Sequence, residues 1–219
     1  MADSIFKKIG TLIGVENACF AKVTRDDATG TEYETDIQEA PGLIEIALTA
    51  NVTNEALGAD NVTLYDIING LDGFDVSVTM ASMGEAGTAY LLGNKIDSNG
   101  VRLENAGDVA PYLAMGFKTL RSDGSYDYIW LLKGKFAPSD QTFRTKEKGK
   151  VNWQTPTLTA SFAPRISDKN IRAIVNDQEA KAATIIADFF KSVYTPALGE
   201  AAAAAEAGEN GEPAADPEA

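Results

Sequence analysis

The chain has 219 residues, of which 44% are hydrophobic, a proportion that suits a folded domain with a conventional core. Its net charge is −13 at pH 7, and it contains one cysteine and no histidine. The acidic balance disfavours a DNA-binding regulator, and the residue counts exclude a zinc finger, a His-based catalytic triad and an internal disulfide.

The sequence also indicates where the chain folds. It has no run of about 20 apolar residues that could span a bilayer. Its first 14 residues lack the hydrophobic core and cleavage site of a signal peptide. We therefore expect folding in a cytoplasm, with Cys19 as a small buried group on the first strand.

Residues 1–16 are predicted to form an N-terminal arm. Apolar side chains in it are spaced like one face of a helix, interrupted by two glycines: Phe6, Ile9, Leu12 and Ile13, with Gly10 and Gly14 between them. The sequence leaves two interpretations open, because the arm could dock on its own domain or on a neighbouring subunit.

Strand periodicity, in which successive side chains point to opposite faces, marks much of the chain after this arm. Clear strands are predicted at 44–52 and 74–80, where apolar and polar side chains alternate. A first strand is predicted at 17–24 and another extended piece at 62–68. A connection is predicted at 54–60 and a turn at 70–73.

A short helix over Glu85–Leu92 is predicted to end at Gly93, with a small hairpin next to it at 95–103. Residues 109–136 then read as a long hairpin with an Asp-Gly turn. Its return strand is expected to place aromatic side chains on one face and polar ones on the other: Tyr126, Tyr128, Trp130 and Phe136 against Asp127, Lys133 and Lys135.

The last third is predicted to hold a polar connection (137–152), a strand (155–164) and an amphipathic helix (178–194). Residues 196–219 form a low-complexity acidic tail of Ala, Glu, Gly and Pro that is expected to be disordered. The fold class is therefore mainly β with α+β content: a β-sandwich or partly closed barrel over residues 17–195, with one flanking helix.

A basic run lies within the polar connection, and its members are Arg144, Lys146, Lys148 and Lys150. One interpretation is a solvated loop that keeps the chain soluble. The other is a cationic loop that meets an acidic surface on a second copy, since complementary patches fix the register of self-association.

Two segments, APYLAMGFKTLRSDGSYDYIWLLKGKF and WQTPTLTASF, resemble the major tail protein family of long-tailed bacteriophages with flexible tails, the subunit of the tail tube. The resemblance covers most of residues 15–165 and weakens in the C-terminal third. Its matching motifs are Pro111-Tyr112, Gly116-Phe117-Lys118, Trp130-Leu131, Lys133-Gly134-Lys135-Phe136 and Gln154-Thr155-Pro156-Thr157-Leu158-Thr159.

This resemblance implies a structural virion protein of the phage tail. Subunits of the family form hexameric rings that stack into a hollow tube, through which DNA passes without specific binding. The family partners are the tape-measure protein and the tail terminator, and no cofactor is expected. The expected inter-subunit contacts are Phe6, Ile9, Arg144, Lys146, Lys148 and Lys150, and the expected acidic residues of the lumen are Glu45, Asp75 and Asp127.

Three alternatives remain open from the sequence. The first is a tube subunit of a contractile or secretion-type injection system. The second is a capsid decoration or adhesion module that binds without polymerising. The third is an unrecognised enzyme, which the absence of histidine disfavours because histidine is the usual general base near neutral pH.

Overall fold

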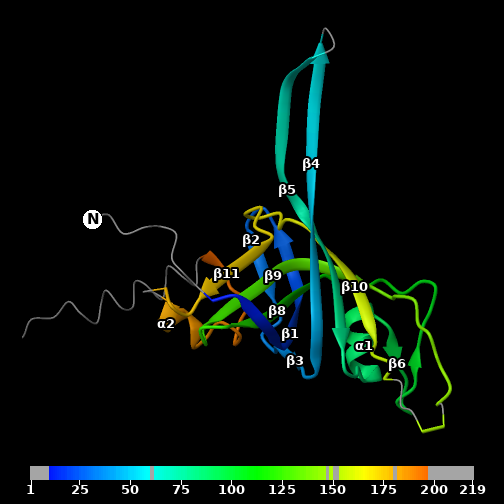
Figure 1. Cartoon of the computed structure of the whole chain (residues 1–219). Helices are drawn as coiled ribbons and strands as arrows, with labels where there is room; N and C mark the ends of the chain where they lie inside the picture. Colours follow the sequence, from blue (N-terminus) through cyan, green and yellow to red (C-terminus); the bar gives the residue numbers. More distant parts are fainter. Residues whose placement is uncertain (1–9, 60–61, 147, 150–152, 180–181, 197–219) are drawn as a thin grey trace, which may run out of the picture.

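The computed structural model describes residues 10–59, 62–146, 148–149, 153–179 and 182–196 (Figure 1). The protein is mostly β. Its elements in chain order are β1 (Leu12–Asp27), β2 (Gly30–Tyr33), β3 (Gln38–Ala40), β4 (Leu43–Ala59), β5 (Val62–Met80), α1 (Glu85–Leu92), β6 (Lys95–Ile96), β7 (Arg102–Leu103), β8 (Leu113–Arg121), β9 (Tyr126–Ala137), β10 (Thr157–Phe162), β11 (Arg172–Asn176) and α2 (Ala182–Ile186).

Nine of these strands form one antiparallel sheet in the order β2-β1-β8-β9-β10-β5-β4, with β3 also paired to β1 and β11 to β9. The sheet curls around a hydrophobic core. Phe20 of β1, Phe136 of β9 and Val76 of β5 are buried in that core, and Ile46 of β4 packs against it. Strands from opposite ends of the sheet thus share one interior, as the expected mainly β fold requires.

A second core lies on the other face of β1, β8 and β9. Trp130 and Leu132 are buried there against Phe189 and Val193 of the C-terminal segment. The indole N–H of Trp130 donates a hydrogen bond of 2.7 Å to the Phe189 carbonyl oxygen. Strand β9 is therefore buried on both faces, which explains its nearly continuous hydrophobic run.

A β-bulge divides β9 and corrects the prediction of one aromatic face. Leu113 pairs with Gly134, whereas Met115 pairs with Leu131, so β9 carries one extra residue between these pairs. The extra residue reverses the alternation of side chains. Trp130 consequently lies in the second core, while Phe136 lies in the first.

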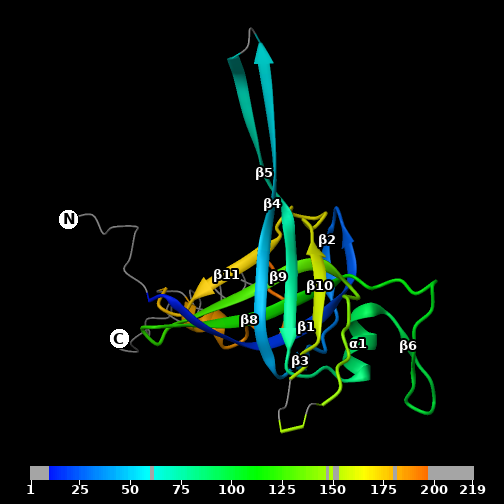
Figure 2. The ribbon, with the colours of Figure 1, turned by 45° about the vertical axis from the view of Figure 1, so that its right-hand side comes forward.

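Strands β4 and β5 extend far beyond the predicted strands. Their pairing continues from Leu43↔Met80 to Ala59↔Val62, so the predicted connection at 54–60 and turn at 70–73 are both wrong. Register shifts near Val52 accommodate the glycines and asparagines that suggested turns. The outer part of this hairpin projects away from the body (Figures 1 and 2).

The predicted N-terminal arm is partly a strand. Residues 12–16 belong to β1 and pair with β8, for example Val15 with Thr119, which corrects the helical interpretation of this stretch. Phe6 and Ile9 lie outside the described residues. The two glycines that interrupt the apolar pattern are compatible with an extended chain, whose partner β8 supplies the hydrogen bonds.

The C-terminal segment also differs from its prediction. Helix α2 covers only Ala182–Ile186 within the predicted helix 178–194, and tight turns come after it, in which Phe189 N–H donates to the Ile186 carbonyl. These turns aim Phe189 and Val193 at Trp130, and an amphipathic stripe serves that packing as well as a helix does. Strand β11 was not predicted. Of the acidic tail, residues 197–219 lie outside the described residues.

Several local predictions are confirmed. Helix α1 ends at Gly93, whose φ of 75° is the left-handed conformation of a helix C-cap. The β6–β7 hairpin turns at Gly100, with a φ of 82°. In β10, Leu158, Ala160 and Phe162 point into the core, and the intervening side chains point out.

Candidate functional site

The outer face of β4, β5 and β10 is lined by small polar and acidic side chains. The register places Glu45 beside Thr79 and Thr49 beside Asp75, while Ser161 pairs with Asp75 from the other side. We call this surface the polar face. Its members are Glu45, Ala47, Thr49, Asp75, Ser77, Thr79, Thr157, Thr159 and Ser161, all of them exposed or half-buried.

The polar face is hollowed. A shallow depression of about 580 Å³ lies over Ala47, Asp75, Ser77 and Thr159 and continues to Lys135 on β9. The strands of this region turn Val76, Val78 and Leu158 toward the core, which leaves mainly short side chains on the outer surface. The result is a smooth surface whose described acids are Glu45 and Asp75.

The structure brings together two of the three predicted lumen residues. Glu45 and Asp75 are exposed on neighbouring strands of the polar face. Asp127 is only 6% exposed. Its carboxylate accepts hydrogen bonds from Arg121 (2.5 Å) and Asn176 (2.7 Å), which neutralise and bury it. Asp127 therefore ties β8, β9 and β11 together, and the expectation that it lies on an open polar face is corrected.

The basic run lies on a loop closed by Gln154. The Arg144 N–H donates to the Gln154 Oε1 atom at 3.0 Å, and the Gln154 Nε2 atom donates to the Arg144 carbonyl oxygen at 3.0 Å. Arg144, Lys146 and Lys148 are exposed on this loop, and Lys150 lies outside the described residues. The Gln154 clamp gives this loop a fixed base, whereas the sequence left open a solvated loop or a contact with a second copy.

Two aromatic side chains beside this clamp were not singled out in the sequence. Phe143 is 85% exposed and Trp153 is 87% exposed, the highest values among the large hydrophobic side chains of the described residues. Each is a direct chain neighbour of a clamped residue. The available signal was their position among polar neighbours, with no apolar alternation that would predict burial.

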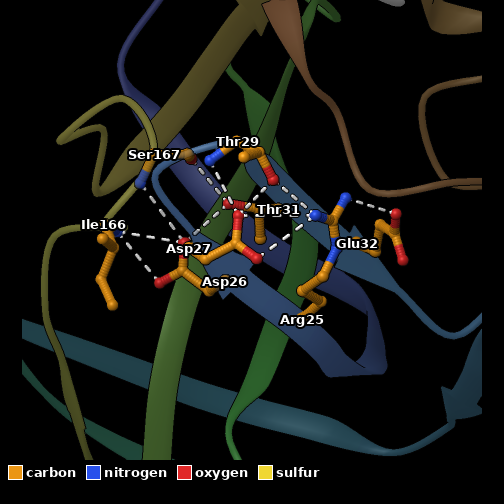
Figure 3. Close-up of polar contacts among 8 residues, drawn as sticks. All are labelled: Arg25, Asp26, Asp27, Thr29, Thr31, Glu32, Ile166 and Ser167. Carbon is orange, nitrogen blue, oxygen red and sulfur yellow. Dashed lines mark hydrogen bonds and ion pairs between the residues drawn. The ribbon is translucent and has the colours of Figure 1, made fainter.

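An ionic network joins the end of the β1–β2 hairpin to the chain after β10. Asp26 accepts hydrogen bonds from the Thr31 hydroxyl (2.8 Å) and the Ile166 N–H (3.0 Å) (Figure 3). It also accepts a hydrogen bond from the Lys133 ammonium (2.5 Å). Burial opposes ionisation of the Asp26 carboxyl, but these donors outweigh it and lower its pKa to about 2. The network stabilises the body that carries the polar face.

The start of β1 is tied to the β8–β9 turn. The Gly10 N–H donates to the Asp123 carboxylate at 2.6 Å, and the Arg121 guanidinium donates to the Gly10 carbonyl at 2.7 Å. Hydrogen bonds from the hydroxyl and N–H of Ser125, together with Gly10, lower the Asp123 pKa to about 2.

The described part of the chain holds neither a metal-binding cluster nor a membrane-spanning helix. No group of three or more Cys, Asp or Glu side chains there could hold a metal ion. None of the helices in the described ranges has the length and apolar character needed to cross a membrane.

No known family model matches the chain, and no curated protein matches it.

Proposed function

We propose that this chain is a structural virion protein of the phage tail, which self-assembles into stacked hexameric rings that form the tail tube. The tube is the conduit for DNA ejection into the host. The proposal joins the sequence resemblance of residues 15–165 to three features of the fold. It requires no catalysis and no cofactor.

The projecting β4–β5 hairpin carries the proposal. From Asn54↔Ile68 to Ala59↔Val62 its two strands pair with each other, outside the body of the sheet (Figure 2). A two-stranded hairpin alone is marginally stable in water, because it buries too little surface to offset the entropy of ordering it. A hairpin of this length therefore calls for a second subunit to cover it.

The polar face supports a channel wall. Its side chains are short, and Glu45 and Asp75 add negative charge. DNA phosphates bind proteins chiefly through Lys and Arg, so an acidic wall lets DNA move without sticking. Six of the 32 acidic residues and none of the 19 basic residues lie beyond residue 195, so the remaining chain still carries a net charge of −7.

Contacts between subunits are assigned to the basic loop with Arg144, Lys146, Lys148 and Lys150, and to the arm with Phe6 and Ile9. A concentrated basic loop on an acidic body favours association between copies over association with DNA. The tape-measure protein and the tail terminator are the further partners that the resemblance implies.

Electron microscopy of the purified protein tests this function. We expect long hollow filaments from the full chain. A variant in which residues 54–68 are replaced by a two-residue Asn-Gly turn should fold, since the body keeps its core, but should stay as single subunits. Wild-type protein that remains monomeric when concentrated would favour a decoration or adhesion module and contradict the tube.

A further inference from the structure

The exposed Trp153 at the base of the basic loop has a matching pocket elsewhere on the chain. A cavity of about 350 Å³ opens between β1 and β3, where β1 bulges between Glu16 and Cys19. Its floor is apolar, with Ala18, Cys19, Ala40, Leu43 and Phe190, and its rim carries Glu16 and Glu39.

We propose that Trp153 of one copy inserts into this β1–β3 pocket of a second copy. The inference rests on the proposed self-assembly and names the surface that the basic loop meets. The partner is thus a second copy of this chain, and the contact joins an aromatic side chain to an acid-rimmed apolar cavity.

Exposure and rigidity argue for Trp153 as the inserted group. At 87% exposure, Trp153 does not fill a cavity of its own chain. The hydrogen bonds between Gln154 and Arg144 fix the loop beside it, which lowers the entropy lost on binding. Tryptophan is the side chain that most often dominates the energy of a protein interface, because it buries a large rigid area.

The charges of the two surfaces are complementary. Arg144, Lys146 and Lys148 are exposed on the loop whose base carries Trp153, and Glu39 is exposed at the rim of the pocket. Glu39 forms no ion pair with any residue that the structure describes, so its charge is available to the basic loop. Glu16 is half-exposed and also contacts Lys118 at 3.3 Å, so it contributes less than Glu39 to the attraction of the basic loop. Opposite charges around an apolar anchor fix the orientation of the contact.

The two tryptophans of the chain make the proposal measurable without a label. Trp130 is fully buried and Trp153 is almost fully exposed. In dilute, unassembled protein, acrylamide should quench about half of the tryptophan emission. In assembled protein the quenchable part should disappear and the emission should shift to shorter wavelength, because both indoles are then buried.

Substitutions on both surfaces test whether Trp153 binds in the β1–β3 pocket. Trp153→Ala should weaken self-association by at least about thirtyfold. Glu39→Arg should weaken it about tenfold, and adding Arg144→Glu to Glu39→Arg should restore most of the loss. Glu32→Arg makes the same change of charge on β2 and serves as the control. It also removes an exposed ion pair with Arg25, but exposed pairs contribute little to stability, so association should stay close to wild type.

The possible outcomes distinguish the Trp153 pocket contact from the proposed tail tube. Filaments in which Trp153 stays quenchable would overturn the pocket contact and leave the tube intact. Shielding of Trp153 that persists, at unchanged affinity, in Glu39→Arg would place the tryptophan on another surface and overturn the pocket as well. A chain that never self-associates would overturn both the contact and the tube.

Discussion

At the scale of single residues, buried polar pairs and close-packed glycines hold the body together. The Asp26–Lys133 ion pair has side chains only 5% and 11% exposed. Gly116 lies against Trp130 and Cys19. These positions set the stability of a single subunit, so their effects are expected in dilute, unassembled protein.

Asp26 predicts a loss of stability in acid. Its folded pKa of about 2 lies below its ordinary value of 3.8, so the stabilisation is complete above about pH 5 and is lost progressively as the pH falls toward about 1. The free energy of unfolding should fall by roughly 2.5 kcal/mol over that interval from this group. Urea unfolding followed by circular dichroism measures it.

Asp26→Asn tests the same ion pair at neutral pH. The change leaves the buried Lys133 without its carboxylate, and we expect a loss of about 3 kcal/mol. Asp188→Asn is the matched control, because the Asp188–Lys191 pair is exposed and such pairs contribute at most about 1 kcal/mol. Equal losses in the two variants would contradict the role of the Asp26 network.

The close packing around Gly116 predicts a loss of stability when a side chain is added there. A Cβ atom there would lie 2.7 Å from the Cys19 sulfur and 2.9 Å from the Trp130 ring, so Gly116→Ala should cost about 1–3 kcal/mol of overpacking. At Gly14, on the paired strand β1, the nearest atom would be 3.9 Å away. Gly14→Ala should therefore be neutral or slightly stabilising, and denaturant unfolding of both variants compares them.

At the scale of elements, the sequence predicted the segments that alternate locally. The polar face results from that alternation, since Glu45 and Asp75 sit at outward positions of clear strands. The β4–β5 extension could not be predicted, because Gly70 and Gly73 signal turns and only long-range pairing turns them into bulges. The conformation of such segments is determined by strand pairing in the folded protein, which a local sequence pattern does not reveal.

Elements that pack through single contacts were harder to predict. The stripe around Phe189 repeats at helical spacing, yet turns after α2 place Phe189 and Val193 on Trp130 equally well. The five-residue strand β11 alternates only between exposed and half-buried positions and leaves the apolar Ile174 exposed, so hydrophobic periodicity did not reveal it. The prediction of one aromatic face on β9 was wrong beyond the bulge, because an inserted residue reverses a period-two pattern.

The charge of the basic loop is predicted to control assembly. Replacing Arg144, Lys146, Lys148 and Lys150 with Glu should leave a folded monomer that no longer polymerises, since the loop would then repel an acidic partner surface. Sedimentation and circular dichroism measure assembly and folding separately. A variant that keeps the charges, with Arg144→Lys and the three lysines changed to Arg, is the matched control and should assemble. Unchanged filaments after charge reversal would contradict the loop assignment.

At the scale of the whole molecule, one curled sheet provides a closed core, a smooth acidic outer face and a projecting hairpin. These three features lie on the same strands, because β4 and β5 line the core, carry Glu45 and Asp75, and extend into the hairpin. Assembly through the hairpin would therefore fix the position of the polar face in the tube. The proposed tube depends on that coupling.

A reconstruction of the assembled filament by electron microscopy tests this coupling most directly. We expect a hollow tube of stacked rings, with Glu45 and Asp75 lining the channel and each β4–β5 hairpin packed against another subunit. Solid fibres, or a tube whose polar face points outward while the hairpins remain uncovered, would contradict it.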